Sequence, residues 1–211
     1  MRGIDPRVVR SRAAVLDAAT TLFLRDGYSA TTMDDIAETA GVSKRTVYNN
    51  FTDKEALFRE VVMAEIGIAE EFATRAAAEL AEPDDLPEAL LALGHRLAVG
   101  ATDPGVVRLR RLVIGEARRF PDLAAEYYRL APGRVMSTLA TAFESLARRG
   151  HLHVADPRRA AEQFAFLVLG AALDRAMFDG RDKAPDTDSL RRAASDGVRT
   201  FLAAHGRVIA K

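Results

Sequence analysis

The chain has 211 residues, and its 30 Lys and Arg balance its 30 Asp and Glu, so its formal net charge is zero. A protein that binds nucleic acid over much of its surface is strongly basic, so any DNA contact of this chain must be local. The absence of cysteine excludes disulfides, thiolate nucleophiles and thiolate metal ligands.

Glycine, proline and capping residues divide the chain into helical segments, and no stretch alternates apolar and polar residues long enough to predict a strand. The first helix is predicted over 8–26 and is ended by Gly27. A second helix follows Thr32, which has the spacing of a capping box with Asp35. Gly41 ends this second helix.

Ser43 is predicted to cap a third helix that covers only 44–49. Thr52 and Glu55 repeat the capping-box spacing and predict a fourth helix over 52–80. At 1.5 Å per residue this helix is roughly 40 Å long, which is enough to connect two domains.

Five further helices are predicted in the rest of the chain, because proline suits a first helical turn and aspartate suits the position before it. Their starts are placed at Asp85, Asp103-Pro104, Phe120-Pro121, Asp156-Pro157 and Asp188. Pro132-Gly133 is expected to kink or split the helix that begins at Pro121, and the last helix to end near His205. The sequence therefore predicts an all-α fold of about nine helices.

Residues 32–51, TMDDIAETAGVSKRTVYNNF, have the spacing of two short helices that cross steeply. Ala37 is small where the helices touch, Gly41 can adopt the positive φ of the turn, and Val47 anchors the second helix. This pattern predicts a helix-turn-helix whose second helix projects outward. Its outer side offers groups that can bind phosphates and base edges, namely Lys44, Arg45, Thr46, Tyr48 and Asn49.

Arginine fits the O6 and N7 acceptors of guanine, so Arg45 is the first candidate to read a base, followed by Thr46. The alternative is a helical hairpin whose polar face is simply solvated. The coincidence of turn chemistry, caps and outward donors favours the DNA-binding interpretation.

The stretch GYSATTMDDIAETAGVSKRTVYNNFTDKEALF, residues 27–58, resembles the DNA-binding region of the TetR family of regulators. The shared pattern is a Gly-Tyr turn, Thr-Thr, Ile-Ala, Ala-Gly-Val-Ser, a Tyr, a Phe and Lys-Glu-x-Leu. The resemblance implies that Arg45 and Thr46 face the groove, while phosphates are held by Thr32, Ser43, Tyr48 and Lys54. Asn49 and Asn50 replace an aromatic or His pair, and Lys44-Arg45 replaces a pair whose second residue is often small, which implies a different base preference.

LRRLVIGEARRFPDLAAEYY and GHLHVADPRRAAEQFAFLVLG are similar to the C-terminal domains of the AefR-like branch of this family. The resemblance implies a DNA-binding domain over 1–55 and a ligand-binding and dimerisation domain over 56–211. The domain over 1–55 includes an N-terminal arm whose arginines add phosphate contacts: Arg2, Arg7, Arg10 and Arg12.

Two sets of residues are predicted for the second domain. A mostly apolar ligand pocket has as candidates Arg111, Glu116, Tyr127, Tyr128, Met136, Phe143 and Phe166. The homodimer interface has as candidates Phe164, Leu167, Val168, Ala171, Ala172, Val198, Phe201 and Leu202. For both sets, ordinary packing within one chain is the alternative.

The sequence lacks the groupings that an enzyme of this size would need. It has no His-Glu-x-x-His, no phosphate-binding Gly-Lys-Ser/Thr loop, no Gly-x-Ser-x-Gly elbow, and no Glu three residues before any of its four histidines. His151 and His153 follow a helix end, where solvated histidines are commoner than metal ligands. We therefore expect no catalysis, no metal and no cofactor.

The longest apolar run, residues 164–173, is far shorter than the ~20 residues that cross a bilayer, so a cytoplasmic protein without membrane contact is expected. The predicted function is a dimeric repressor that leaves a palindromic operator in double-stranded DNA when a small-molecule effector binds. An activator or co-regulator with the same DNA-binding head, or a catalytic or small-molecule-binding helical protein that retains it, are the alternatives.

Overall fold

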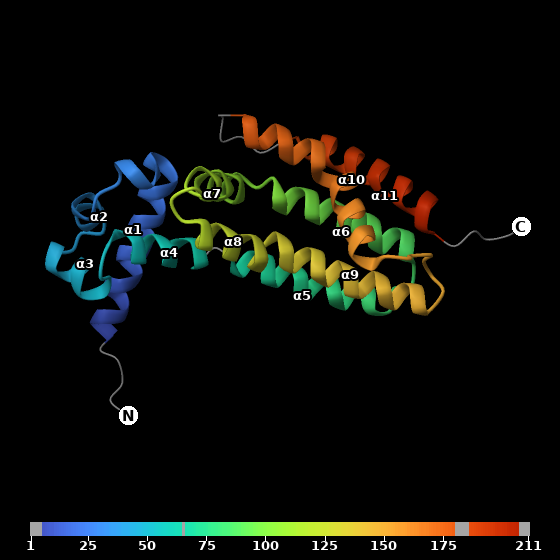
Figure 1. The fold of residues 1–211 in the computed structure, drawn as a ribbon, viewed down its shortest axis with the longest axis horizontal. Helices are drawn as coiled ribbons and strands as arrows, with labels where there is room; N and C mark the ends of the chain where they lie inside the picture. Colours follow the sequence, from blue (N-terminus) through green and yellow to red (C-terminus); the bar gives the residue numbers. More distant parts are fainter. Residues whose placement is uncertain (1–5, 65, 180–185, 207–211) are drawn as a thin grey trace, which may run out of the picture. The chain divides into compact units, whose positions relative to one another are not determined.

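The computed structural model describes residues 6–64, 66–179 and 186–206, and these residues form eleven helices (Figure 1). Apart from one isolated bridge between Leu152 and Gly206, the described residues contain no β structure, and the all-α prediction is confirmed. The helices are α1 (Pro6–Ala30), α2 (Met33–Thr39), α3 (Lys44–Asn50), α4 (Lys54–Ala64), α5 (Gly67–Ala81), α6 (Leu86–Ala101), α7 (Pro104–Gly115), α8 (Pro121–Leu130), α9 (Pro132–Arg148), α10 (Pro157–Phe178) and α11 (Thr187–His205).

The number of helices rises from about nine to eleven because two predicted helices are each divided. Pro132 separates α8 from α9, as predicted. The continuous helix predicted over 52–80 is wrong, because α4 ends at Ala64 and α5 begins at Gly67. Ile66 N donates to Met63 O at 3.3 Å, a tighter turn than an α-helix makes, and glycine has little helix propensity.

The cap of α4 also differs from the prediction. Asp53, rather than Thr52, accepts a hydrogen bond from Ala56 N, at 2.8 Å. Asp53 therefore occupies the capping position, and α4 begins at Lys54 instead of directly after Thr52. The predicted cap of α6 is confirmed, since the Asp85 side chain accepts from Glu88 N at 2.9 Å.

By their contacts the residues group into two units, residues 1–67 with 109–127, and residues 68–108 with 128–211. The first unit contains the predicted helix-turn-helix, and the second contains α9, α10 and α11. The boundary expected after residue 55 stays a prediction.

An aromatic cluster forms the core of the first unit. Gly27 has φ 81°, which interrupts the regular geometry of α1 after Asp26, and the following Tyr28 is buried. The Tyr28 ring lies 4.9 Å from that of Phe58 and 5.0 Å from that of Phe120, and Phe58 lies 5.2 Å from Phe23. These contacts hold the end of α1 against α4 and the start of α8.

A second aromatic cluster lies in the core of the second unit. Phe143, Phe164 and Phe201 come from α9, α10 and α11, and their ring centres are 5.1 to 5.5 Å apart. Helices α10 and α11 lie alongside each other (Figure 1). At Gly197 they approach so closely that a Cβ atom would lie 2.5 Å from the carbonyl oxygen of Leu167.

Candidate nucleic-acid interface

Short-range hydrogen bonds fix the ends of α2 and α3. Thr32 accepts from Asp35 N at 3.1 Å, and Asp35 accepts from Thr32 N at 3.1 Å, so the predicted capping box is confirmed. Gly41 has φ 63° in the turn between the helices, a conformation that glycine adopts without strain. Ser43 caps α3 by accepting from Thr46 N at 3.1 Å.

Buried side chains on the inner faces of the two helices set the orientation of α3. Val47 is fully buried, and from α2 Met33, Ile36 and Ala37 are buried as well. The backbone tightens the turn further, since Val42 N donates to Ala37 O at 3.1 Å. The opposite side of α3 is therefore exposed.

Three residues share the exposed face of α3. Arg45, Tyr48 and Asn49 are spaced three and four residues apart, so they lie on one side of the helix, and all three are exposed. Their side chains form no hydrogen bond or ion pair with any described residue. A guanidinium, a phenol and a carboxamide are thus available together to base edges and phosphates.

The other predicted DNA-binding groups already have partners. Thr46 is half-buried, and its hydroxyl lies 2.9 Å from that of Ser43. The Thr32 hydroxyl lies 2.6 Å from Asp35 Oδ2, and Lys44 Nζ lies 2.5 Å from Asp34 Oδ2. The side chains on the exposed face of α3 therefore differ from these neighbouring groups, which already bond to other residues of the protein.

Lys54 is the most strongly held of these groups. Its Nζ atom donates to the carbonyl oxygens of Tyr28, at 2.9 Å, and Thr31, at 2.8 Å, and lies over the Tyr28 ring. Burial, and then the positive charge of Arg119, lowers the pKa of the Lys54 ammonium. Two of its three donors are used by carbonyl oxygens at the end of α1, which leaves one donor for another acceptor.

The N-terminal arginines differ in their surroundings. Arg12 forms an ion pair with Glu60, donates to Asn50 O at 3.2 Å and stacks over the Phe51 ring. Arg10 donates to Pro6 O at 3.3 Å. Arg2 lies outside the described residues. Arg12 thus fastens α1 to the end of α3, a role that its sequence position did not reveal.

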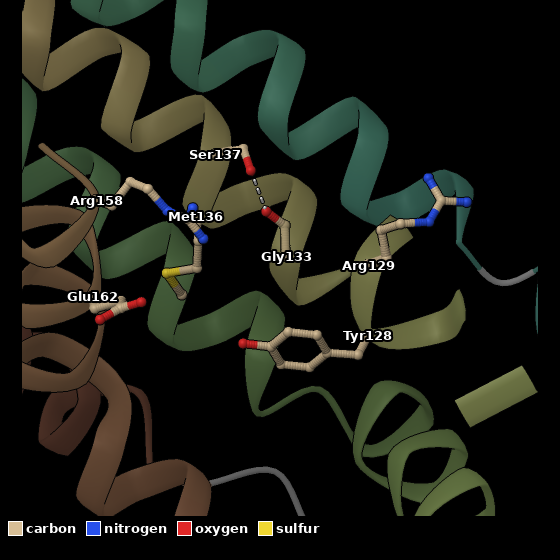
Figure 2. A pocket seen from close by; sticks show the side chains of 7 residues that line it. All are labelled: Tyr128, Arg129, Gly133, Met136, Ser137, Arg158 and Glu162. Atoms are coloured by element: carbon tan, nitrogen blue, oxygen red, sulfur yellow. Dashed lines mark hydrogen bonds between the residues drawn. The ribbon is translucent and has the colours of Figure 1, made fainter. Parts of the chain in front are cut away.

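Two of the predicted ligand-binding residues line a half-open pocket in the second unit (Figure 2). The pocket has a volume of about 240 Å³ and is lined by Tyr128, Arg129, Gly133, Met136, Ser137, Arg158 and Glu162. Figure 2 shows the Tyr128 ring and the Met136 thioether together, with Arg158 and Glu162 of α10 on one side and Arg129 pointing away. The pocket thus combines an apolar surface with a cation and a carboxylate.

The remaining predicted ligand-binding residues lie elsewhere. Phe143 is buried in the aromatic cluster of the second unit, and Phe166 is 67% exposed. Arg111, Glu116 and Tyr127 belong to the first unit. Arg158 and Glu162 were missed because an Arg and a Glu four residues apart on a helix usually indicate a solvated face.

The predicted dimer residues also divide into two groups. Five are buried within the single chain, which is the alternative considered from the sequence: Phe164, Val168, Ala172, Val198 and Phe201. Of the others, Leu167 is 42% exposed, Ala171 is exposed and Leu202 is half-buried. Phe178, which the sequence did not single out, is 85% exposed on the same helix as Leu167.

Among the described residues, none of the helices combines the length and the apolar character needed to cross a membrane. The same residues bring together no group of three or more His, Asp or Glu side chains that could hold a metal ion.

Comparisons with known proteins match both parts of the chain. Residues 15–61 match the family model of bacterial regulatory proteins of the tetR family, and residues 88–207 match the C-terminal domain of AefR-like transcriptional repressors. The transcriptional repressor ComR of Escherichia coli is 46% identical over 54 residues, which are 26% of this chain and 26% of that repressor.

Solved structures extend the similarity over nearly the whole chain. A TetR-family transcriptional regulator from Mesorhizobium loti is 34% identical, with a TM-score of 0.87 over 96% of this chain and 100% of that one. The flavonoid-responsive regulator FrrA is 31% identical, with a TM-score of 0.72 over 95% of this chain and 99% of that one.

Proposed function

Since the chain belongs to the TetR family of transcriptional regulators, we propose that it is a repressor that binds a palindromic operator as a homodimer and leaves it when a small molecule binds. The exposed face of Arg45, Tyr48 and Asn49 on α3 is the observation that carries the proposal. A dimer presents two such faces, and successive major grooves lie about 34 to 36 Å apart.

In the proposed complex each α3 lies in a major groove. Arg45 reads a guanine through O6 and N7, and Tyr48 and Asn49 contact the neighbouring bases or the backbone. The DNA backbone on either side is contacted by Ser43 and by the third donor of Lys54, and by Thr32 once its hydroxyl releases Asp35. Arg10 and Arg7, at the start of α1, add attraction to the phosphates that does not depend on the DNA sequence.

The dimer is proposed to form through the exposed apolar side of α10. Leu167, Ala171 and Phe178 lie four and seven residues apart, which places them on one stripe of the helix. An exposed stripe of this kind favours a second copy of the same chain, since symmetric pairing covers both copies at once. Repression is supported by the name of ComR, a transcriptional repressor.

The effector is proposed to bind at the pocket beside Tyr128 and Met136. The Tyr128 ring and the thioether suit a small aromatic molecule, and Arg158 and Glu162 suit acidic or hydroxyl groups on it. FrrA is named as a flavonoid-responsive regulator, and flavonoids are small aromatic molecules. Binding releases the operator only if the effector prefers the conformation that binds DNA less well.

The test is the binding of the purified full chain to the intergenic DNA beside its own gene. Fluorescence anisotropy at two salt concentrations, with unrelated duplex as competitor, measures affinity and preference together. Binding by two protomers per site that resists the competitor is expected. If selection from a random library of duplexes also enriches no sequence, the proposed function is wrong.

A further inference from the structure

One ion pair joins the two helices of the helix-turn-helix. Lys44 Nζ lies 2.5 Å from Asp34 Oδ2, and the two side chains are 66% and 56% exposed. The hydrogen bond from Lys44 to Asp34 raises the pKa of the ammonium, which therefore stays charged. The contact connects the first residue of α3 to the first turn of α2.

The charges around this pair are distributed unevenly. Helix α2 carries three carboxylates and no basic residue, whereas α3 carries Lys44 and Arg45 and no acidic residue. Of the α2 carboxylates, Asp35 is engaged in the capping box, and Glu38 has no ion pair within the described part of the chain. Asp34 is the carboxylate that holds a cation of α3.

A DNA-binding surface gains affinity for any sequence with each cation that neutralises a phosphate, and each such contact adds about 0.9 to the slope of log affinity against log salt. A lysine that is already bonded to a carboxylate gains less from a phosphate. If it moved there, it would leave the carboxylate unpaired close to the negative backbone. Base reading by Arg45, one residue further along α3, has no such cost.

We propose that Asp34 lowers the affinity of this protein for DNA of random sequence by holding Lys44 away from the phosphates. The inference rests on the DNA-binding function proposed above. It makes Asp34 a residue that sets the sequence-independent part of DNA affinity, since a phosphate contact by Lys44 would strengthen binding to every sequence.

The test measures binding of the full chain to a fluorescein-labelled duplex of random sequence between 50 and 200 mM NaCl. Asp34→Asn frees the lysine, and we expect tighter binding with a salt slope steeper by about 0.9, which is an extra loss of roughly threefold to fourfold over this range. Lys44→Met is expected to keep the salt slope of the unmodified chain, because Lys44 contacts no phosphate there, and Asp34→Asn with Lys44→Met is expected to lose the steeper slope.

Glu38→Gln is the matched control, because it removes the same charge one turn along α2 without releasing a cation. Its salt slope is expected to stay unchanged. The proposal is overturned if Asp34→Asn behaves like Glu38→Gln, or if Lys44→Met alone lowers the slope by about 0.9, which would make Lys44 a phosphate contact already. An unmodified chain that binds no duplex at 50 mM NaCl would instead remove the DNA-binding function, and this inference with it.

Discussion

The ammonium of Lys54 lies 4.3 Å from the centre of the Tyr28 ring and donates a hydrogen bond of 2.9 Å to the Tyr28 carbonyl oxygen. The first residue of α4 is thereby fixed to the end of α1, where unpaired carbonyl groups carry partial negative charge. Lys54, for which the resemblance to the family implies a phosphate contact, thus also connects two helices of the fold.

Lys54→Met is therefore expected to lower the free energy of unfolding by about 1 to 3 kcal/mol, because two carbonyl groups lose a charged donor. Urea denaturation followed by circular dichroism measures this loss. Lys44→Met, which removes an exposed lysine, is expected to change it by less than about 0.5 kcal/mol. Equal effects of the two substitutions would show that the Lys54 contacts do not stabilise the fold.

Tyr28 should make stability depend on pH in the alkaline range. Burial raises its pKa above the ordinary value of 10.0, so above that pH the unfolded chain releases its proton first. The stability that Tyr28 contributes is fully present below pH 10 and is lost as the pH rises through the raised pKa. The free energy of unfolding should accordingly fall less in Tyr28→Phe than in the unmodified chain.

The control for this comparison is Tyr48→Phe, since Tyr48 is exposed. It is expected to show the same alkaline fall as the unmodified chain, measured by urea denaturation at several pH values. The lowered pKa of Lys54 acts in the opposite direction, raising stability with pH, and both variants retain it. An undiminished fall in Tyr28→Phe would contradict the assignment.

Arg45→Ala is expected to cost about 1 to 3 kcal/mol of operator binding and to relax the preference for one base pair in each half-site. Selection of bound duplexes from a random library, before and after the substitution, locates that base pair. Arg191→Ala, on α11, is the matched control and should leave the selected sequence unchanged. A uniform loss on all sequences would show that Arg45 contacts phosphate and reads no base.

Leu167→Arg is expected to convert the proposed dimer to a monomer, because it places a charge in the exposed apolar stripe of α10. Sedimentation velocity measures the change, and circular dichroism checks that the helices persist. Leu91→Arg on α6 introduces the same charge at a comparably exposed leucine and should stay dimeric. A dimer that survives Leu167→Arg would place the interface elsewhere.

The local features were predictable from the sequence because neighbouring residues determine them. Gly27 ends the regular part of α1, Thr32 and Ser43 cap the next two helices, and Gly41 supplies the positive φ of the turn. The division between α4 and α5 was missed because the apolar spacing continues across it. Only the turn at Ile66 and the weak propensity of Gly67 reveal it.

The long-range features are harder to predict, because the apolar face of a helix does not indicate which element covers it. The apolar positions of α10 and α11 fit an interface between copies as well as a core, and five of the eight chosen residues proved to be core. The pocket combines α8, α9 and α10, so Arg158 and Glu162 could not be connected to Tyr128 without the fold.

The close approach of α11 to α10 at Gly197 has a consequence for how such regulators diverge. Because the two backbones touch there, the helices keep one spacing whatever side chains they expose. In the dimer proposed above, changes at outward positions such as Leu167 and Ala171 after a gene duplication would alter which copies fit together without disturbing the core beneath. Two descendant regulators can then stop exchanging subunits while both remain folded.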